Sequence, residues 1–532
     1  MNCHFNKAQY LLGEDVVLTS FGGEITEAVV YKLAQRINAK LSYGGSTVTV
    51  SGLGAGGYGI DVFFGEEKWE GAFDVVESQR HVVRYSFLSD FTPEEKDTAD
   101  VEWMKELHLN CIQFYDWMYR HDELISPTDE YADPMGRKTS LTTLRSKINA
   151  CHEQNIRPFA YGAIYAATEE TYRAHPEWAM YTADGRPLRF ADWLYYMNVS
   201  EKCGWSKHLL EQYAEAIRFG FKGIHMDTYG FPKWVWDIDG RKLDLPGDFT
   251  RLVNAAADKV AKEDEKAGVI FNAVNNWPTE AVIKTSEDAA YVEVWPPNDT
   301  YHDLYTIIRN IKTATDKSVV LAAYMKPFAA SNNEEAEYAL RLTWAVISAS
   351  GGTQLVFGEN GAVLCDSYYA KYAKLRSEFL PVAQKYCDYL VRYSELLYDD
   401  NGIDISRTAA GGINEDICFA ADNTAFSVDG RANSVWTIIR ESSKRINIQL
   451  INLCGNDDLW DTAKNRPRPI EDIRITLRLD RELAGVWFAS PDGETMAAQP
   501  LAAESTESAQ GRMYTVRVPR LACWASVWVD IK

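Results

Sequence analysis

The sequence predicts a multidomain α/β protein, in which a (β/α)8 TIM barrel is flanked by an N-terminal immunoglobulin-like β-sandwich and a C-terminal antiparallel β-domain. The chain has 532 residues, too many for one hydrophobic core. Eight strand–loop–helix units follow one another between residues 82 and 391, and strand patterns without helices stand on either side. The expected domains are therefore residues 1–80, 81–398 and 399–532.

The first 80 residues show β-branched segments separated by glycine-rich breaks, at 14–21, 27–34, 46–53, 57–64 and 72–79. This pattern is typical of a small β-sandwich of the immunoglobulin type. The glycine-rich stretch 52–59 is followed by a strand and not by a helix, so it is interpreted as a turn and not as a phosphate-binding loop.

The barrel strands are expected at 82–89, 111–118, 157–166, 222–230, 268–277, 289–297, 318–325 and 353–360. Each precedes a stretch with apolar residues three or four positions apart, as expected for amphipathic helices, and the last such helix is expected at 367–391. A doubly wound open sheet is the alternative, but no glycine-rich dinucleotide turn supports it. On the barrel interpretation, the active site lies at the carboxyl ends of the strands.

Beyond residue 400 the strand patterns return, at 402–408, 416–423, 425–431, 434–441, 445–453, 472–479, 485–492, 514–519 and 524–531. Asn, Asp, Gly and Pro separate these segments, as expected for an antiparallel β-domain.

The composition excludes several kinds of partner. The chain has 55 basic and 76 acidic residues, a formal charge of −21, which argues against nucleic acid and against an anionic membrane surface. Aromatic residues make up 12% of the chain, and many stand beside polar residues, a mixture that suits a neutral sugar substrate. The nine cysteines are scattered, without metal-ligand spacing. With no signal peptide visible, a cytoplasmic monomer or small homo-oligomer is expected, or a secreted protein if a leader has been removed.

Two acidic residues stand at predicted strand ends. Asp227 follows the apolar run of the fourth strand, and Glu293 lies in the sixth. Glycoside hydrolysis needs two carboxylates across the mouth of such a barrel, one as nucleophile and one as acid/base, about 5–5.5 Å apart in a retaining enzyme. This chemistry requires no metal and no cofactor. The alternative is structural, with Asp227 as a helix cap and Glu293 as a salt-bridge partner.

Other polar and aromatic residues at or near strand ends are candidates for substrate binding. They are Tyr115, Asp116, Trp117, Arg120, His121, Tyr161, His225, Tyr229, Asn272, Asn275, Trp295 and Glu359. The long loop 168–199 is a candidate to block one end of the cleft. Trp234 and Trp236, in the loop after the fourth strand, are candidate sugar platforms.

Four segments together resemble one known family. FGFKGIHMDTYG contains Asp227, AAYVEVWPPND contains Glu293, and IQFYDWMYRHD and FNAVNNW accompany them. These segments resemble glycoside hydrolase family 66, the dextranases and cycloisomaltooligosaccharide glucanotransferases, over nearly the whole chain. The resemblance places the nucleophile at Asp227 and the acid/base at Glu293, and the other two segments along the cleft.

The resemblance implies retaining, endo-type cleavage of α-1,6-glucosidic linkages in dextran or isomaltooligosaccharides through a covalent glucosyl-enzyme. Members that make cyclic products carry a sugar-binding module inserted in the barrel. The close spacing of the strand–helix units leaves no such insertion here, which favours hydrolysis. Three alternatives stay open: a cyclising or disproportionating α-1,6-glucan transglycosylase, an α-glycosidase of other linkage specificity, and a catalytically idle carbohydrate-binding protein.

Overall fold

The computed structural model describes residues 3–331, 333–398, 402–508 and 511–532. Its centre is an eight-stranded sheet whose strands are all parallel and pair in chain order. A parallel bridge between Phe87 and Gly358 brings the eighth strand beside the first, so the sheet is nearly closed into a barrel. The strands are β10 (Tyr85–Leu88), β11 (Cys111–Phe114), β14 (Arg157–Ala163), β18 (Gly223–Asp227), β19 (Gly268–Val274), β20 (Ala289–Glu293), β21 (Ser318–Ala322) and β22 (Thr353–Gln354).

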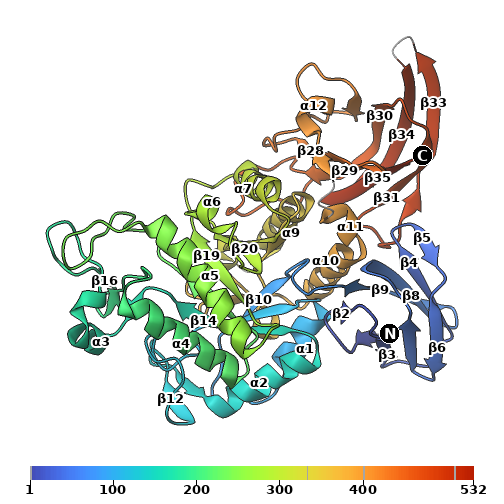
Figure 1. Ribbon diagram of the computed structural model, residues 1–532. Helices are drawn as coiled ribbons and strands as arrows, with labels where there is room; N and C mark the ends of the chain where they lie inside the picture. The colour runs from blue at the N-terminus through green and yellow to red at the C-terminus, as the bar shows by residue number, and fades with distance from the viewer. Residues whose placement is uncertain (1–2, 332, 399–401, 509–510) are drawn as a thin grey trace.

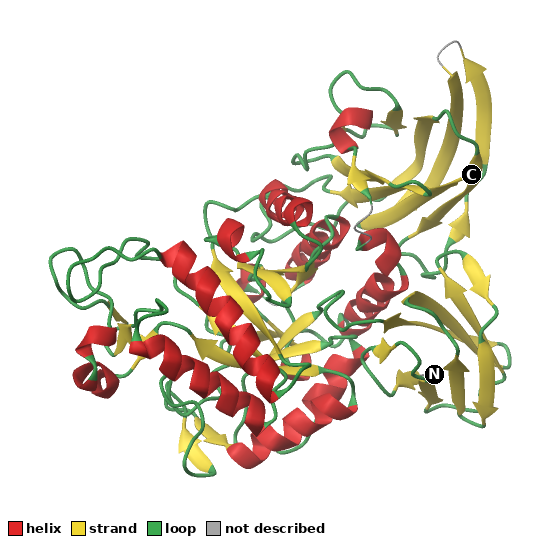
Figure 2. Cartoon of the chain, in the orientation of Figure 1, coloured by secondary structure: helices red, strands yellow, loops and turns green. Residues whose placement is uncertain are grey.

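Helices alternate with these strands and surround them (Figures 1 and 2). They are α1 (Ala99–Glu106), α2 (Leu141–Glu153), α4 (Gly204–Phe219), α5 (Leu245–Glu263), α6 (Thr279–Val282), α7 (Tyr301–Ala314), α9 (Glu334–Ala349) and α10 (Leu380–Arg392). Helix α7 shows why such segments are helical. It begins with a capping box between Thr300 and Asp303, and it buries Leu304, Ile308 and Ile311 on one face.

Two sheets precede the barrel. One has four strands, β1 (Cys3–Phe5), β3 (Val16–Ser20), β7 (Thr47–Ser51) and β6 (Lys40–Gly44); the other has five, β2 (Tyr10–Leu11), β9 (Glu67–Val76), β8 (Gly56–Phe64), β4 (Glu27–Lys32) and β5 (Gln35–Ile37). Alternate residues of both sheets, such as Val48 and Ile60, share one apolar core. The expected boundary at residues 80 and 81 falls between β9 and β10. The immunoglobulin type of these sheets stays a prediction.

Two further sheets follow the barrel and share a second apolar core. One contains β25 (Ile403–Asp404), β27 (Phe426–Ser427), β28 (Val435–Glu441), β29 (Arg445–Asn452), β35 (Trp524–Ile531), β31 (Leu483–Ala489) and β32 (Gln499–Pro500); the other contains β26 (Ile417–Ala420), β30 (Ile470–Arg478), β34 (Gly511–Leu521) and β33 (Ala503–Ser508). The expected boundary at 398 and 399 meets residues 399–401, outside the described residues. The strand expected at 402–408 is only partly correct, because β25 is short and a helix, α12 (Ser406–Ala410), follows it.

The helix expected at 367–391 is wrong in its first half. Helix α10 begins only at Leu380, and Pro381 lies in its first turn, where the missing N–H of proline costs no hydrogen bond. In the preceding segment, Tyr369 is buried among the side chains that fill the barrel.

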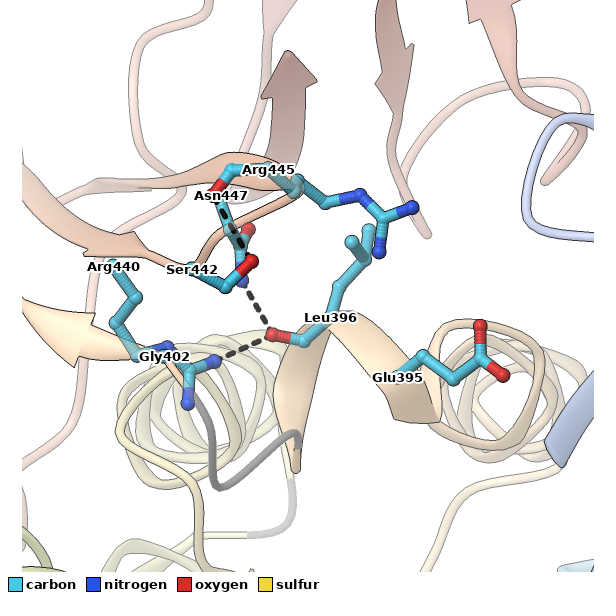
Figure 3. A pocket seen from close by; sticks show the side chains of 7 residues that line it. All are labelled: Glu395, Leu396, Gly402, Arg440, Ser442, Arg445 and Asn447. Carbon is cyan, nitrogen blue, oxygen red and sulfur yellow. Dashed lines mark hydrogen bonds between the residues drawn. The ribbon is translucent and has the colours of Figure 1, made fainter. Parts of the chain in front are cut away.

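Helix α10 lies between the N-terminal and C-terminal sheets (Figure 1). The glycine-rich stretch allows this contact, because a Cβ at Gly59 would lie 2.4 Å from the guanidinium carbon of Arg392. The next helix, α11 (Ser394–Leu397), is fixed to the C-terminal domain. Arg440 donates to the carbonyls of Leu396 (2.6 Å) and Leu397 (3.0 Å), beside a small pocket that contains none of the predicted site residues (Figure 3).

Candidate active site

The alternation of side chains along three neighbouring strands brings the predicted catalytic residues together. On β18, Ile224 and Met226 face the outer core, while His225 contacts the rings of Tyr85 and Tyr291 inside the barrel. Asp227 therefore points inward at the carboxyl end. By the same alternation Asn272 on β19 and Glu293 on β20 point to the same end of the barrel.

Asn272 joins the two carboxylates. Its side-chain nitrogen donates to Asp227 Oδ1 at 2.7 Å and to Glu293 Oε2 at 3.0 Å. Because both oxygens bond the same nitrogen, they lie less than about 6 Å apart. For this pair of oxygens, the bound is consistent with the roughly 5–5.5 Å between the carboxyl groups of retaining glycosidases.

Each carboxylate has a further phenolic donor. Tyr161, from β14, donates its hydroxyl to Asp227 Oδ2 at 2.7 Å. Tyr324 donates to Glu293 Oε1. Tyr324 was not among the residues predicted from the sequence, although it follows β21 and is a polar residue at a strand end, like the others.

The environment raises the pKa of both acids. Burial, and then the charge of Glu293, raise the pKa of Asp227 to about 7, against the hydrogen bonds from Tyr161 and Asn272. Burial also raises the pKa of Glu293, while the hydrogen bonds from Tyr324 and Asn272 lower it. Coupled carboxyl groups with raised pKa values in a cleft are typical of catalytic sites.

The segment after β11 contributes Tyr115 and Asp116 to this site. The Tyr115 ring lies 5.1 Å from the Tyr161 ring and stacks on Tyr369 at 4.3 Å. The pKa of Asp116 is raised to about 7, mainly by burial; the charge of Arg137 lowers it, and the charges of Asp133 and Asp227 raise it. Asp116 also has left-handed backbone angles (φ 50°), a costly conformation for a non-glycine residue.

The structure places three neighbouring candidates differently. The prediction that Trp117 binds a sugar is wrong. Its side chain is completely buried, its indole donates to the Tyr161 carbonyl at 3.1 Å, and its ring packs on Phe221, so no surface is left for a sugar. Arg120 pairs with exposed Glu170 at 3.4 Å. His121 stays near the site, with its ring 6.4 Å from that of Tyr161.

Two more of the predicted substrate-binding residues, His225 and Glu359, are buried and have partners within the protein. His225 is buried one layer below Asp227, and its Nδ1 pairs with the Tyr85 hydroxyl at 3.0 Å. Burial lowers the pKa of His225 to about 3, so it is neutral. Glu359 is buried and accepts from the backbone N–H (3.1 Å) and hydroxyl (2.7 Å) of Ser89, which holds the end of the eighth strand beside the first.

The last three candidates surround the site. Asn275 donates to the carbonyl of Pro296 at 2.9 Å and accepts from Asn298 at 2.7 Å, so its side chain fixes the loop beside Glu293. Trp295 is half-buried, 5.6 Å from the Tyr324 ring. Tyr229 is buried against Tyr165 and Tyr196.

Of the two candidate platforms, Trp234 is exposed, whereas Trp236 is partly buried, and its backbone pairs with that of Tyr181. All nine cysteines lie in the described part of the chain, and none is in a disulfide. Within the residues that the structure describes, no cluster of three or more His, Cys, Asp or Glu is placed to hold a metal ion. In the same residues, none of the helices is both long and apolar enough to cross a membrane.

Comparisons with known proteins agree with this architecture. Two cycloisomaltooligosaccharide glucanotransferases of Niallia circulans are each 24% identical to the chain, over 698 and 611 residues. The alignments cover 98% and 86% of this chain, which spans 72% and 62% of the length of the two relatives. The first alignment has 698 positions, more than the 532 residues of the chain, which means that the first relative contains insertions.

Solved structures share the fold. A cycloisomaltooligosaccharide glucanotransferase of Paenibacillus sp., in complex with cycloisomaltoheptaose, superimposes with a TM-score of 0.88 at 22% identity, over 99% of both chains. An α-amylase of Geobacillus thermoleovorans, in complex with acarbose, superimposes with a TM-score of 0.52 at 11% identity, over 86% of this chain and 99% of its own. The model of glycosyl hydrolase family 66 matches residues 6–528. The chain belongs to glycosyl hydrolase family 66.

Proposed function

We propose that this protein is a retaining glucanotransferase, which cleaves α-1,6-glucosidic linkages and transfers the released segment to the hydroxyl of another glucan. Asp227, in its ionised form, attacks the anomeric carbon and forms a covalent glycosyl-enzyme. Glu293, in its protonated form, gives its proton to the leaving oxygen. Glu293 then removes a proton from the acceptor hydroxyl, which displaces Asp227 and restores the original configuration.

The observation that carries this proposal is the bridge of Asn272 between the two carboxylates. It supports double displacement, because it holds an oxygen of each carboxyl group less than about 6 Å apart, as the carboxyl pair of a retaining glycosidase requires. Tyr161 and Tyr324 further fix the direction of each carboxyl group.

Transfer to a sugar, and not to water, is favoured by the relatives, both of which are named as glucanotransferases. Cyclisation is a weaker candidate, since the spacing of the strand–helix units leaves no inserted sugar-binding module. Hydrolysis of dextran, the main prediction from the sequence, stays unconfirmed. The cytoplasmic location and the oligomeric state also stay predictions.

Product analysis tests the proposal. The protein is incubated with isomaltotetraose, with dextran and, as a linkage control, with maltotetraose, and products are separated by chromatography. We expect linear isomaltooligosaccharides both longer and shorter than isomaltotetraose, and no reaction of maltotetraose. Reducing ends that increase in step with every bond cleaved would identify a hydrolase, and cyclic products a cyclising enzyme. No reaction with any α-1,6-glucan would overturn the proposal.

Asp116→Ala is expected to lower kcat by about 10²-fold, because a carboxylate that hydrogen-bonds sugar hydroxyls stabilises the transition state of the reaction. The raised pKa of Asp116 shows that its carboxylate is unfavourably buried in the unliganded protein. We therefore expect the melting temperature of Asp116→Ala to stay near that of the unaltered protein. Full activity of the folded fraction, together with a large fall in melting temperature, would make Asp116 structural.

Tyr324→Phe is expected to move the basic limb of the kcat/KM profile to higher pH. The tyrosine hydroxyl stabilises ionised Glu293 and so lowers its pKa; without that donor the pKa rises, and Glu293 keeps its proton to higher pH. The maximal rate is expected to fall by about tenfold, because one fixed hydrogen bond to a charged group is lost. Tyr291→Phe is the matched control, since its hydroxyl bonds Tyr369 at 2.9 Å and not Glu293. A basic limb that stays in place would contradict the assignment.

A further inference from the structure

We propose that the tip of a hairpin after β14, residues 190–193, is a sugar-stacking wall for glucosyl units that extend from the catalytic carboxylates. Phe190 and Trp193 are its two platforms, and the ligand is an uncharged α-1,6-linked glucan chain. This inference rests on the proposed function and adds to it a binding element that sets the preferred chain length.

The hairpin exposes two aromatic side chains near the mouth of the barrel. Its strands are β16 (Arg189–Phe190) and β17 (Leu194–Tyr196), and β17 pairs on its other side with β15 (Ala166–Ala167), which follows β14. The exposed fractions are 44% for Phe190 and 38% for Trp193. Large apolar side chains left exposed together on a protein surface are typical of binding sites.

Both platforms are connected to the proposed nucleophile through neighbouring residues, Trp193 by two rings and Phe190 by one ring and a backbone hydrogen bond. The Trp193 ring lies 5.9 Å from that of His121, which lies 6.4 Å from Tyr161, the donor to Asp227. The Phe190 ring lies 6.0 Å from that of Tyr165. The residue before Tyr165, Ile164, donates its backbone N–H to the Asp227 carbonyl at 2.9 Å. The tip is therefore continuous with the catalytic site.

A polar atom near this wall lacks a partner. His121 is only 8% exposed, and its Nδ1 has no hydrogen-bond partner among the residues that the structure describes. Buried polar atoms are nearly always bonded, so this nitrogen is available to a hydroxyl group of a ligand or to a water molecule. A sugar has a hydroxyl group that can hydrogen-bond His121 and an apolar ring face that can stack on Trp193. An anionic ligand would be repelled by ionised Asp227 and by the net charge of −21.

The backbone of the tip is held in an unusual conformation. Ala191 and Asp192 both have left-handed angles (φ 52° and 62°), which are unfavourable for a residue with a Cβ. Arg189 stabilises this turn: it donates to the Asp192 carbonyl and lies over the Tyr195 ring at 5.1 Å. The strained turn presents Phe190 and Trp193 at its two ends, and strain of this kind is concentrated at binding sites.

A binding measurement in the Asp227→Asn background tests the inference without turnover. Affinities for isomaltotriose and isomaltoheptaose are measured by calorimetry for the full-length chain, with and without Trp193→Ala or Phe190→Ala. We expect each change to weaken binding of isomaltoheptaose by about tenfold, the effect of uncovering one large aromatic contact, and to affect isomaltotriose less. Trp193→Phe, which keeps a ring, is expected to restore most of the affinity. Phe21→Ala is the matched control, since Phe21 is 74% exposed on the N-terminal domain.

The outcomes separate this inference from the proposed function. Unchanged affinity for isomaltoheptaose in both alanine variants would overturn the inference, as would absence of binding to the Asp227→Asn parent. A parent that binds isomaltoheptaose through Trp193, while the unaltered protein turns over no α-1,6-glucan, would support the inference and overturn the proposed function. An equal loss in Phe21→Ala would show a non-specific effect and would also overturn the inference.

Discussion

Asp227→Ala is expected to lower turnover of α-1,6-glucan by roughly 10³-fold or more, because the covalent step loses its nucleophile. Added azide is expected to restore part of the activity by occupying the space of the missing carboxylate. Azide would attack the anomeric carbon from the same face, and the product would be the β-glycosyl azide, with inverted configuration. Rates are measured with and without azide, and the product is identified by nuclear magnetic resonance.

Asp227→Asn is the matched control for azide rescue, since its side chain fills the same space and leaves none for the anion. The stability of both variants separates catalysis from folding. An acid whose pKa is raised on folding, as that of Asp227 is to about 7, binds its proton more tightly in the folded state, so its ionisation destabilises the protein as the pH rises from about 4 to 7. At pH 8 the alanine and asparagine variants should therefore melt no lower than the unaltered protein. Near-normal turnover in Asp227→Ala would remove this residue from the mechanism.

Glu293→Gln is expected to lower turnover of natural glucan by about 10²- to 10⁴-fold, the contribution of general acid catalysis. Glutamine keeps the shape of the side chain but cannot donate a proton to the leaving oxygen. A glycosyl fluoride, whose leaving group needs no such proton, is expected to form the glycosyl-enzyme at a rate much closer to that of the unaltered protein. The ratio of the two rates in each protein is the measurement.

Glu287→Gln is the matched control for Glu293→Gln. Glu287 is also a buried acid with a raised pKa, about 8, but it precedes β20, at the opposite end of the strand from Glu293, and pairs with Lys317. The fluoride should show no selective advantage in that variant. Equal losses on glucan and fluoride in Glu293→Gln would assign Glu293 a role other than acid catalysis.

The strand-end rule predicted the centre of the site from the sequence, and its failures have local causes. Asp227, Asn272 and Glu293 end or nearly end three neighbouring strands, so their meeting follows from the barrel alone. The prediction for Trp117 failed because the left-handed backbone at Asp116 interrupts the alternation of side chains along the strand, so that the Trp117 side chain enters the core. No composition or periodicity signal marks that turn.

Contributions from outside the strands could not be predicted in the same way. Tyr369 stacks on Tyr115 from a segment whose apolar spacing is typical of a helix, and tertiary burial overrides that preference. The bonds of Glu359 to Ser89 depend on closure of the barrel, which joins residues 270 positions apart. The glycine-rich stretch leads into strand β8, as the sequence predicted, but its contact with α10 requires the assembled domains.

Trapping the covalent intermediate tests the central claim most directly. Glu293→Gln is incubated with an α-isomaltosyl fluoride, quenched in acid, digested and analysed by mass spectrometry. We expect one isomaltosyl unit per chain, attached through an ester to Asp227 in the peptide that contains β18. A glycosyl group on another residue, or rapid turnover of the fluoride to a product of inverted configuration without any adduct, would contradict double displacement at Asp227.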